Sequence, residues 1–157
     1  MSCDLEQAAR AYGSYFETLR SDNVERLHDL AAPNIRFVDP FNDVRGVDQV
    51  VCILRRMFED ATEVSLRMLD RACQGDRCFL RWEFFCRPRR LAKGRAWRIE
   101  GVSMVRFDAE ERVVEHIDYW DAAEQFYGRL PVIGTLLRGI GRRLQLPPDP
   151  AVADAPR

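Results

Sequence analysis

The feature that most constrains the fold is a change in the spacing of hydrophobic residues near position 60. Before it, apolar residues recur at the helical period over residues 4–20 and 46–58. After it, apolar and polar residues alternate with the period of a strand, over residues 63–68, 80–87, 97–107 and 113–120. The pattern therefore predicts an α+β fold, in which helices gather on one face of a curved sheet made of an antiparallel meander.

The segment between the two helical patterns predicts a short helix and a short strand. Residues 21–23 (Ser-Asp-Asn) supply a helix N-cap, and Pro33 is predicted to end that helix. The apolar strand 35–38 then stops at Asp39, which directly precedes a proline. Aspartate is common in turns, and a following proline favours extended geometry. Asp39 is therefore either a turn residue or a base at the edge of an apolar pocket.

The residues after position 121 predict a helical extension. Asp121 can cap a helix that reaches about Tyr127, and Pro131 stands where a second helix would start. We therefore expect one domain over residues 1–146, with a core of about 4–121 and an extension of 122–146. The proline- and alanine-rich tail 147–157 is predicted to be disordered.

The second helix of the extension, residues 132–144, has an ambiguous amphipathic pattern. Arg138, Arg142 and Arg143 interrupt its apolar residues, as in helices that lie on membrane surfaces. We favour a helix that covers the open end of the sheet or forms a subunit interface, and we expect no membrane partner.

Charge and composition exclude several classes of protein. The net charge is -1 and the pI is near 6.2, so no global field attracts nucleic acid. No apolar run approaches the roughly 20 residues that a membrane span needs. Asp4 and Glu6 precede any apolar run, which argues against a secretory signal. We expect a cytoplasmic protein.

The five cysteines are scattered, and no C-x-x-C pair occurs. With only two histidines in the chain, a metal site is not expected. Cys73 and Cys78 flank a predicted turn and could approach each other. We nevertheless expect free thiols in a reducing cytosol rather than a disulfide.

Polar residues on the predicted inner faces of the last two strands are candidates for chemistry. Ser103 shares a face with Trp97 and Val105. In the last strand His116 and Asp118 share a face, but neither face of this strand is wholly apolar, so its orientation stays open. A buried Asp118 would be costly unless hydrogen-bonded, which suits an acid/base residue but also a structural partner of Arg81 or Arg98.

Three segments carry a resemblance to a known superfamily. They are AYGSYFETLRSDNVERLHDLAAPNIRFVDPF, RIEGVSMVRFD and VVEHIDYWD. Together they resemble the nuclear transport factor 2-like superfamily, which includes ketosteroid isomerases and SnoaL-like polyketide cyclases. The resemblance implies a cone-like curved sheet with the N-terminal helices on its concave face, no cofactor, no metal, and a homodimer.

The resemblance also implies roles for individual residues. Asp39 falls on the isomerase base and Tyr15 on the oxyanion-hole tyrosine. Ser103 stands where the isomerases have a carboxylic acid, and a hydroxyl is a weaker acid. The same alignment turns His116, Asp118 and Trp120 into the pocket, and SnoaL-like cyclases use a pocket aspartate as acid/base. An apolar ligand would then contact aromatic walls made by Trp120, Trp82, Trp97, Phe84 and Phe41.

Two functions follow from these residues. The first is a cofactor-independent isomerase or cyclase that acts on an apolar carbonyl compound such as a steroid, polyketide or terpenoid. The second is a non-catalytic module of the same superfamily that binds a ligand or a protein, which the serine at position 103 favours. An epoxide hydrolase ranks lowest, because Arg98 and Arg106 are predicted to lie on the face opposite Ser103. Tyr15, His116 and Ser103 each also suit a purely structural role in the core.

Overall fold

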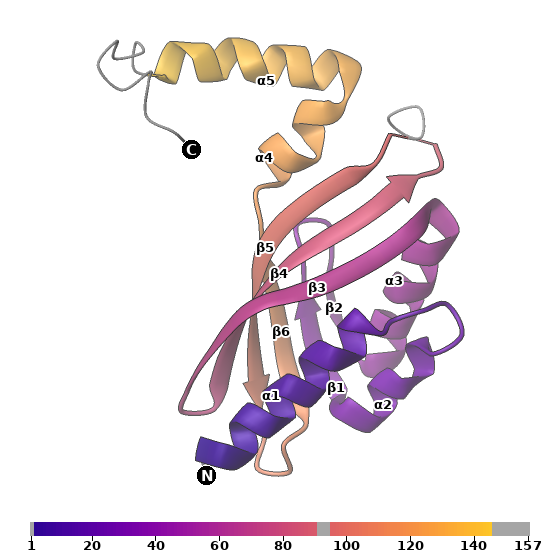
Figure 1. Cartoon of the computed structure of the whole chain (residues 1–157), viewed down its shortest axis with the longest axis vertical. Helices are drawn as coiled ribbons and strands as arrows, with labels where there is room; N and C mark the ends of the chain where they lie inside the picture. The colour runs from indigo at the N-terminus through magenta and orange to yellow at the C-terminus, as the bar shows by residue number, and fades with distance from the viewer. Residues whose placement is uncertain (1, 91–94, 146–157) are drawn as a thin grey trace.

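The computed structural model describes residues 2–90 and 95–145. Its helices are α1 (Ser2–Glu17), α2 (Leu27–Leu30), α3 (Val47–Asp60), α4 (Ala122–Gln125) and α5 (Pro131–Leu144), with 3-10 turns η1 (Val24–Arg26) and η3 (Tyr127–Arg129). Its strands are β1 (Ala31–Val38), β2 (Asp43–Arg45), β3 (Ala61–Gln74), β4 (Arg77–Pro88), β5 (Trp97–Phe107) and β6 (Val113–Tyr119) (Figure 1).

The strands form a curved six-stranded sheet in the order β2-β1-β6-β5-β4-β3. Strands β3 to β6 are the predicted antiparallel meander, and β1 joins it by pairing in parallel with β6. The short strand β2, which the sequence pattern does not indicate, forms a hairpin with β1. The predicted α+β class is confirmed.

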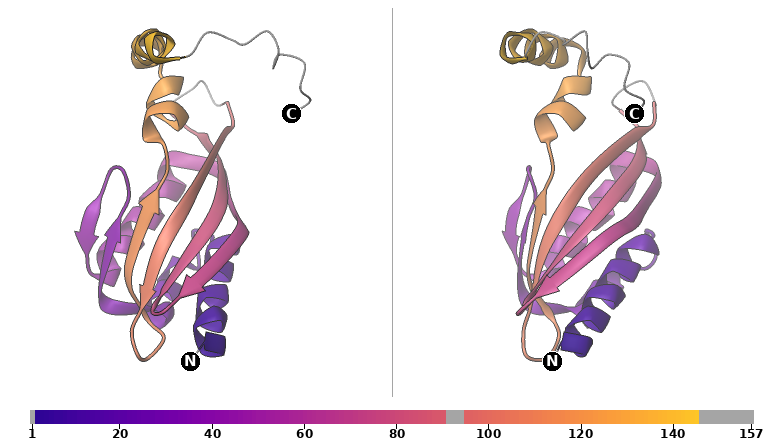
Figure 2. Two further views of the ribbon diagram at one scale, coloured as in Figure 1. Left: turned by 90° about the vertical axis from the view of Figure 1, so that its left-hand side faces the viewer. Right: turned by 60° about the vertical axis from the view of Figure 1, so that its left-hand side comes forward.

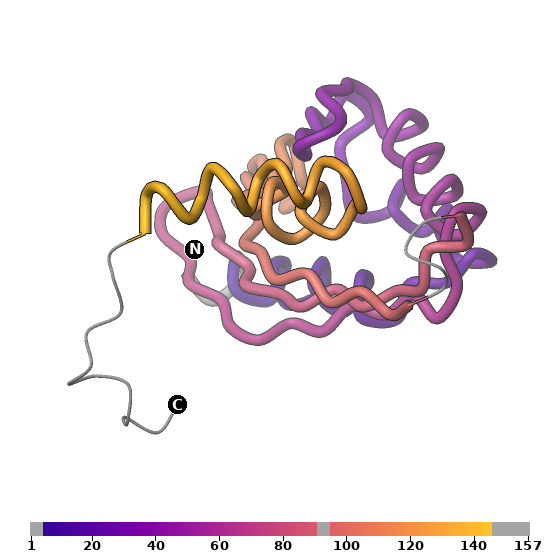
Figure 3. Tube along the Cα trace, turned by 90° about the horizontal axis from the view of Figure 1, so that it is seen from above, coloured from indigo at the N-terminus to yellow at the C-terminus, as the bar shows by residue number. Residues whose placement is uncertain are grey.

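The helices α1 and α3 pack against the sheet, which curves around them (Figures 2 and 3). Helix α1 contacts β3 and β4 through a buried stripe that includes Tyr12 and Phe16. Helix α3 contacts β1 and β3 and buries Val50 and Val51. Removing these apolar side chains from water is the main favourable contribution to this packing.

Pro33 does not end a helix as predicted, because α2 stops at Leu30 and Pro33 lies within β1. The register of the β1–β6 pair shifts between Ala31 and Arg36. Proline has no N–H to donate, so it is tolerated at such an interruption of the ladder.

The C-terminal extension begins as predicted but packs differently. The Asp121 side chain accepts a hydrogen bond from the Glu124 amide at 3.0 Å, and Pro131 is the first residue of α5. Helix α5 does not cover the open end of the sheet; it projects beyond it (Figures 1 and 2). The predicted disordered tail 147–157 lies outside the described residues. Within the described ranges no helix is long and apolar enough to cross a membrane.

The cysteines differ from the prediction at one place. Cys73 and Cys78 form a disulfide with an S–S distance of 2.01 Å, so the expectation of free thiols was wrong for this pair. The two residues are direct partners in the β3–β4 hairpin, where cross-strand neighbours lie close together. Cys52 and Cys86 are free.

Candidate functional site

A cavity of about 1000 Å³ lies between the inner face of the sheet and helix α3. This volume is at the upper end of the range typical of small-molecule sites. All five aromatic residues that the sequence analysis selected line the cavity, and Phe126 of the extension lines it as well. Phe41 lies at its rim, half-exposed, with ring centroids 5.6 Å from Trp120 and 5.0 Å from Phe126.

Polar side chains form a hydrogen-bonded cluster in this apolar wall. Strand β6 turns His116 and Asp118 inward, and His116 Nε2 lies 2.8 Å from Asp118 Oδ1. The other ring nitrogen, Nδ1, lies 2.9 Å from the hydroxyl of Tyr12 on α1. Tyr12 and His116 are both buried, so helix α1 reaches Asp118 through the imidazole.

The chain Tyr12–His116 is the first arm of hydrogen bonds to Asp118. The second arm, Trp82–Ser103, reaches the same carboxylate oxygen from β4 and β5. Ser103 Oγ donates to Asp118 Oδ1 at 2.5 Å, and Trp82 Nε1 donates to Ser103 Oγ at 2.7 Å. Gly101 makes this possible, because a Cβ at that position would lie 2.6 Å from the Trp82 ring. Trp82 and Gly101 are direct cross-strand partners, and the missing side chain leaves room for the indole.

The direction of the hydrogen bonds in this cluster follows from the donors and acceptors present when Asp118 is ionised. Burial, and next the nearby Asp118 charge, raise the pKa of Tyr12 well above its usual value, so its hydroxyl keeps its proton. An ionised Asp118 only accepts, so His116 Nε2 carries a proton toward it. In the neutral imidazole Nδ1 then accepts from Tyr12. Both arms therefore donate toward Asp118 Oδ1, and none of the described residues donates to Oδ2.

Asp39 also lines the cavity, but its carboxylate is engaged in its own turn. Its Oδ1 accepts hydrogen bonds from the amides of Phe41 and Asn42 at 2.7 and 2.8 Å. The Asn42 side-chain amide donates to both carboxylate oxygens, at 3.0 and 2.9 Å. This arrangement closes the β1–β2 hairpin and corresponds to the turn interpretation of Asp39.

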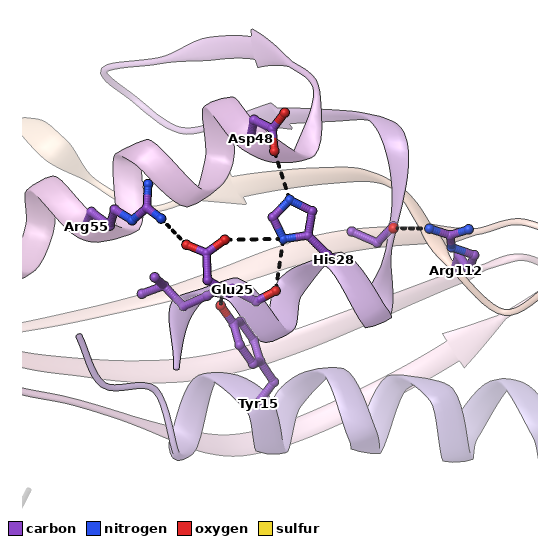
Figure 4. A network of polar contacts seen from close by, with 8 residues as sticks. Tyr15, Glu25, His28, Asp48, Arg55 and Arg112 are labelled. Carbon is purple, nitrogen blue, oxygen red and sulfur yellow. Dashed lines mark hydrogen bonds and ion pairs between the residues drawn. The ribbon is translucent and has the colours of Figure 1, made fainter. Parts of the chain in front are cut away.

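Tyr15 is not among the residues that line the cavity. Its hydroxyl donates to the carbonyl oxygen of Val24 at 2.9 Å, on the side of α1 that faces η1 and α2 (Figure 4). Burial raises the pKa of Tyr15 as well. The expected pair of Asp39 and Tyr15 in one pocket is therefore not assembled, and Tyr12 is the tyrosine that reaches the polar cluster.

The arginines considered as partners of Asp118 lie elsewhere. Arg98 pairs with Glu83 and Glu100, and Arg106 with Glu115, on the outer face of the sheet. Arg81 also pairs with Glu100. None of the three lines the cavity. Within residues 2–90 and 95–145, no group of three or more acidic, histidine or cysteine side chains is arranged to hold a metal ion.

Two residues were missed by sequence reasoning: Tyr12, which bonds to the polar cluster, and Phe126, which lines the cavity. Tyr12 belongs to the apolar stripe of α1, and that helical period was the signal that could have found it. Alignment to the isomerases instead selected Tyr15, which is three residues away. Phe126 was not selected because the extension was treated as separate from the pocket, whereas its ring lies 5.3 Å from Trp97.

Solved structures with the same architecture place the chain in a class. A protein of ketosteroid isomerase-like fold from Catenulispora acidiphila, in complex with trimethylamine, matches with a TM-score of 0.67 and 15% identity over 79% of this chain and 93% of that one. TsrD from Streptomyces laurentii matches with a TM-score of 0.65 and 18% identity over 81% of this chain and 94% of that one. An LEH-like epoxide hydrolase from M. tuberculosis matches with a TM-score of 0.63 and 16% identity over 88% of this chain and 96% of that one. The fold is nuclear transport factor 2-like.

Sequence comparison identifies the family within this class. Residues 13–116 match the model of the SnoaL-like domain, so the chain belongs to the SnoaL-like family. Comparison with curated proteins gave no match. The resemblance inferred from the three sequence segments is confirmed.

Proposed function

We propose that this protein is a cofactor-independent isomerase or cyclase that acts on an apolar, carbonyl-bearing molecule, with Asp118 as its acid/base residue. The observation that carries the proposal is the hydrogen bonding of Asp118. Its Oδ1 takes the donors of both arms, while Oδ2 is left for a molecule in the cavity. A carboxylate held this way is oriented before the substrate binds.

The proposed step is removal of a proton from a carbon next to the substrate carbonyl. The C–H bond breaks, its electron pair forms an enolate, and the proton moves to Oδ2 of Asp118. If a C=C bond beside the enolate extends it to a dienolate, return of the proton from Asp118 to the γ carbon isomerises the substrate. Attack of the enolate carbon on a second carbonyl instead closes a ring, and the resulting alkoxide takes the proton back from Asp118. Neither outcome needs a redox cofactor. His116 and Ser103 would hold the carboxylate in place throughout.

Asp118 replaces Asp39 in this proposal because the two carboxylates have different partners. The amides of the β1–β2 turn already use Asp39, and Tyr15, its expected oxyanion partner, binds the Val24 carbonyl. Asp39 remains a residue of the cavity wall that a ligand can contact.

The test is exchange of solvent deuterium into candidate steroid, polyketide and terpenoid ketones. Wild type should catalyse exchange beside the carbonyl, and Asp118→Asn should lose it. Asp39→Asn is the matched control, because it makes the same change at the other cavity aspartate and should retain most of the rate. Equal loss in both variants, or none in Asp118→Asn, would remove Asp118 as the base.

A binding protein without turnover is the second candidate. It is favoured by the serine at position 103, since that hydroxyl and the Trp82 N–H already donate within the protein and are not free to stabilise an oxyanion. Native mass spectrometry of the purified protein would distinguish the two functions. A ketone that binds at micromolar affinity but never exchanges would support the binding protein.

Homodimer formation is also a proposal, and the outer face of the sheet supports it. Phe79, Met104 and Ile117 are direct neighbours across β4, β5 and β6, and Phe79 is 45% exposed. A contiguous apolar stripe of this kind suits a subunit contact. Light scattering should show a dimer that Met104→Arg dissociates, and a monomeric wild type would contradict it.

A further inference from the structure

Helix α5 is attached to the rest of the protein by its small and polar side. Gly134 is buried against η3, where an added Cβ would lie 2.1 Å from the Gly128 carbonyl oxygen. Arg138, one turn further on, donates to the same carbonyl oxygen at 3.1 Å. These contacts orient the helix and determine which of its faces points away from the domain.

The face that points away is apolar. Val132, Leu136 and Ile140 follow one another at four-residue spacing and are 82%, 66% and 51% exposed. Ile133 and Leu144 extend the same face and are 43% and 83% exposed. Because the helix rotates about 100° per residue, this face lies largely opposite Gly134 and Arg138. Helix α5 projects beyond the sheet (Figures 1 and 2), so the domain itself does not cover it.

The charges around this face have one sign. From Phe126 to Gln145 the charged residues are Arg129, Arg138, Arg142 and Arg143, and the segment has no aspartate or glutamate. Pairing α5 with α5 of a second copy would bring these arginines together. A basic helix with a bare apolar face instead matches an anionic lipid surface, where apolar side chains enter the acyl boundary and arginines meet the headgroups.

We propose that α5 docks this protein on the surface of an anionic lipid bilayer. The helix lies in the plane of the interface rather than across it, and Arg142 and Arg143 in its last turn extend to the phosphates. This differs from the packed helix expected from sequence, because that expectation assumed that the apolar face would turn toward the sheet.

Docking would also orient the cavity. Phe126 and Tyr127 line the cavity, and only a few residues separate them from the first residue of α5. Phe41 and Tyr127, with ring centroids 6.3 Å apart, are both exposed at this rim. A lipid-bound α5 would therefore hold the cavity rim close to the membrane, from which an apolar molecule could enter.

The experiment is co-sedimentation of the full chain with vesicles of phosphatidylcholine plus phosphatidylserine, and with vesicles of phosphatidylcholine alone. The wild type should bind the mixed vesicles about 30-fold more strongly, as expected from two surface arginines. Arg142→Gln with Arg143→Gln should weaken binding to the mixed vesicles about 30-fold. Leu136→Ser with Ile140→Ser should weaken it by at least about tenfold, because apolar burial is lost without a change in charge.

Gly139→Ser with Gly141→Ser is the matched control, since a Cβ at either position meets nothing within 4 Å. This pair should bind the mixed vesicles like wild type. Circular dichroism of each variant establishes that the domain is folded. The proposal is overturned if wild type does not sediment with anionic vesicles, or if the Leu136/Ile140 pair binds like wild type. A lipid-free dimer that this pair dissociates would assign the face to a second copy instead.

Discussion

Asp118 and Asp39 both line one cavity, yet their carboxylates are held in opposite ways. Asp118 is oriented by side chains from α1, β4, β5 and its own strand, and all of those contacts converge on Oδ1. Asp39 is bound by residues within three positions of it in the chain, which use both of its oxygens. In this cavity the carboxylate oriented by distant elements has both of its donors on one oxygen, whereas the carboxylate that closes its own turn has a donor on each oxygen.

The largest expected effect comes from Asp118→Asn. If Asp118 transfers the proton, its loss should lower the turnover rate by about 10²–10⁴, the usual contribution of a positioned acid/base group. Steady-state kinetics on any ketone that passes the exchange assay would measure it. A loss of similar size in Asp39→Asn would erase the distinction between the two aspartates.

The next effect comes from Gly101→Ala, which introduces a Cβ into the space of the Trp82 ring. Overpacking of this kind costs about 1–3 kcal/mol, so thermal unfolding should shift downward. Displacing Trp82 also removes its hydrogen bond to Ser103, so catalysis should fall. Gly139→Ala, on open surface, is the control and should change neither the unfolding temperature nor the catalytic rate. Unchanged activity in a destabilised Gly101→Ala protein would show that the Trp82–Ser103 arm does not position Asp118.

A pH effect of intermediate size follows from Tyr12. Its folded-state pKa lies above the usual 10.0, so between these two values the folded state binds more protons than the unfolded state. Stability due to this group is therefore complete below pH 10 and falls above it, by about 1.4 kcal/mol per pH unit. Between pH 9 and 11 the free energy of unfolding, measured by denaturant titration, should fall less steeply for Tyr12→Phe than for wild type. Parallel curves would mean that the Tyr12 hydroxyl is not buried in solution.

The smallest effect belongs to Asp39. Replacing it with alanine removes the acceptor for two turn amides, which can partly rebind to water, so the loss should be about 1 kcal/mol in the free energy of unfolding. Asp39→Asn keeps an acceptor oxygen and should cost less. Urea titration of the two variants measures this order, and a larger loss for asparagine would mean that the charge itself matters.

Much of the fold follows from local pattern. The alternation in β5 correctly placed Trp97, Ser103 and Phe107 on the inner face, and Asp121 and Pro131 begin helices where their chemistry predicts. Strand β6 was ambiguous because its register against β5 shifts between Arg106 and Phe107. That shift lets Val113 face the core while His116 and Asp118 also face inward, which no strict two-residue period can indicate.

The sequence by itself determined the α+β class and the inward face of Ser103, because periodicity depends on neighbouring residues, and its resemblance to known proteins determined the family. Only that resemblance, and not periodicity, turned His116 and Asp118 toward a pocket. Only the tertiary structure decided which groups meet there. Tyr12 rather than Tyr15 reaches His116 because the rotation of α1 against the sheet depends on packing across the whole core. The role of Asp39 in its turn and the outward face of α5 likewise depend on contacts that sequence spacing does not specify.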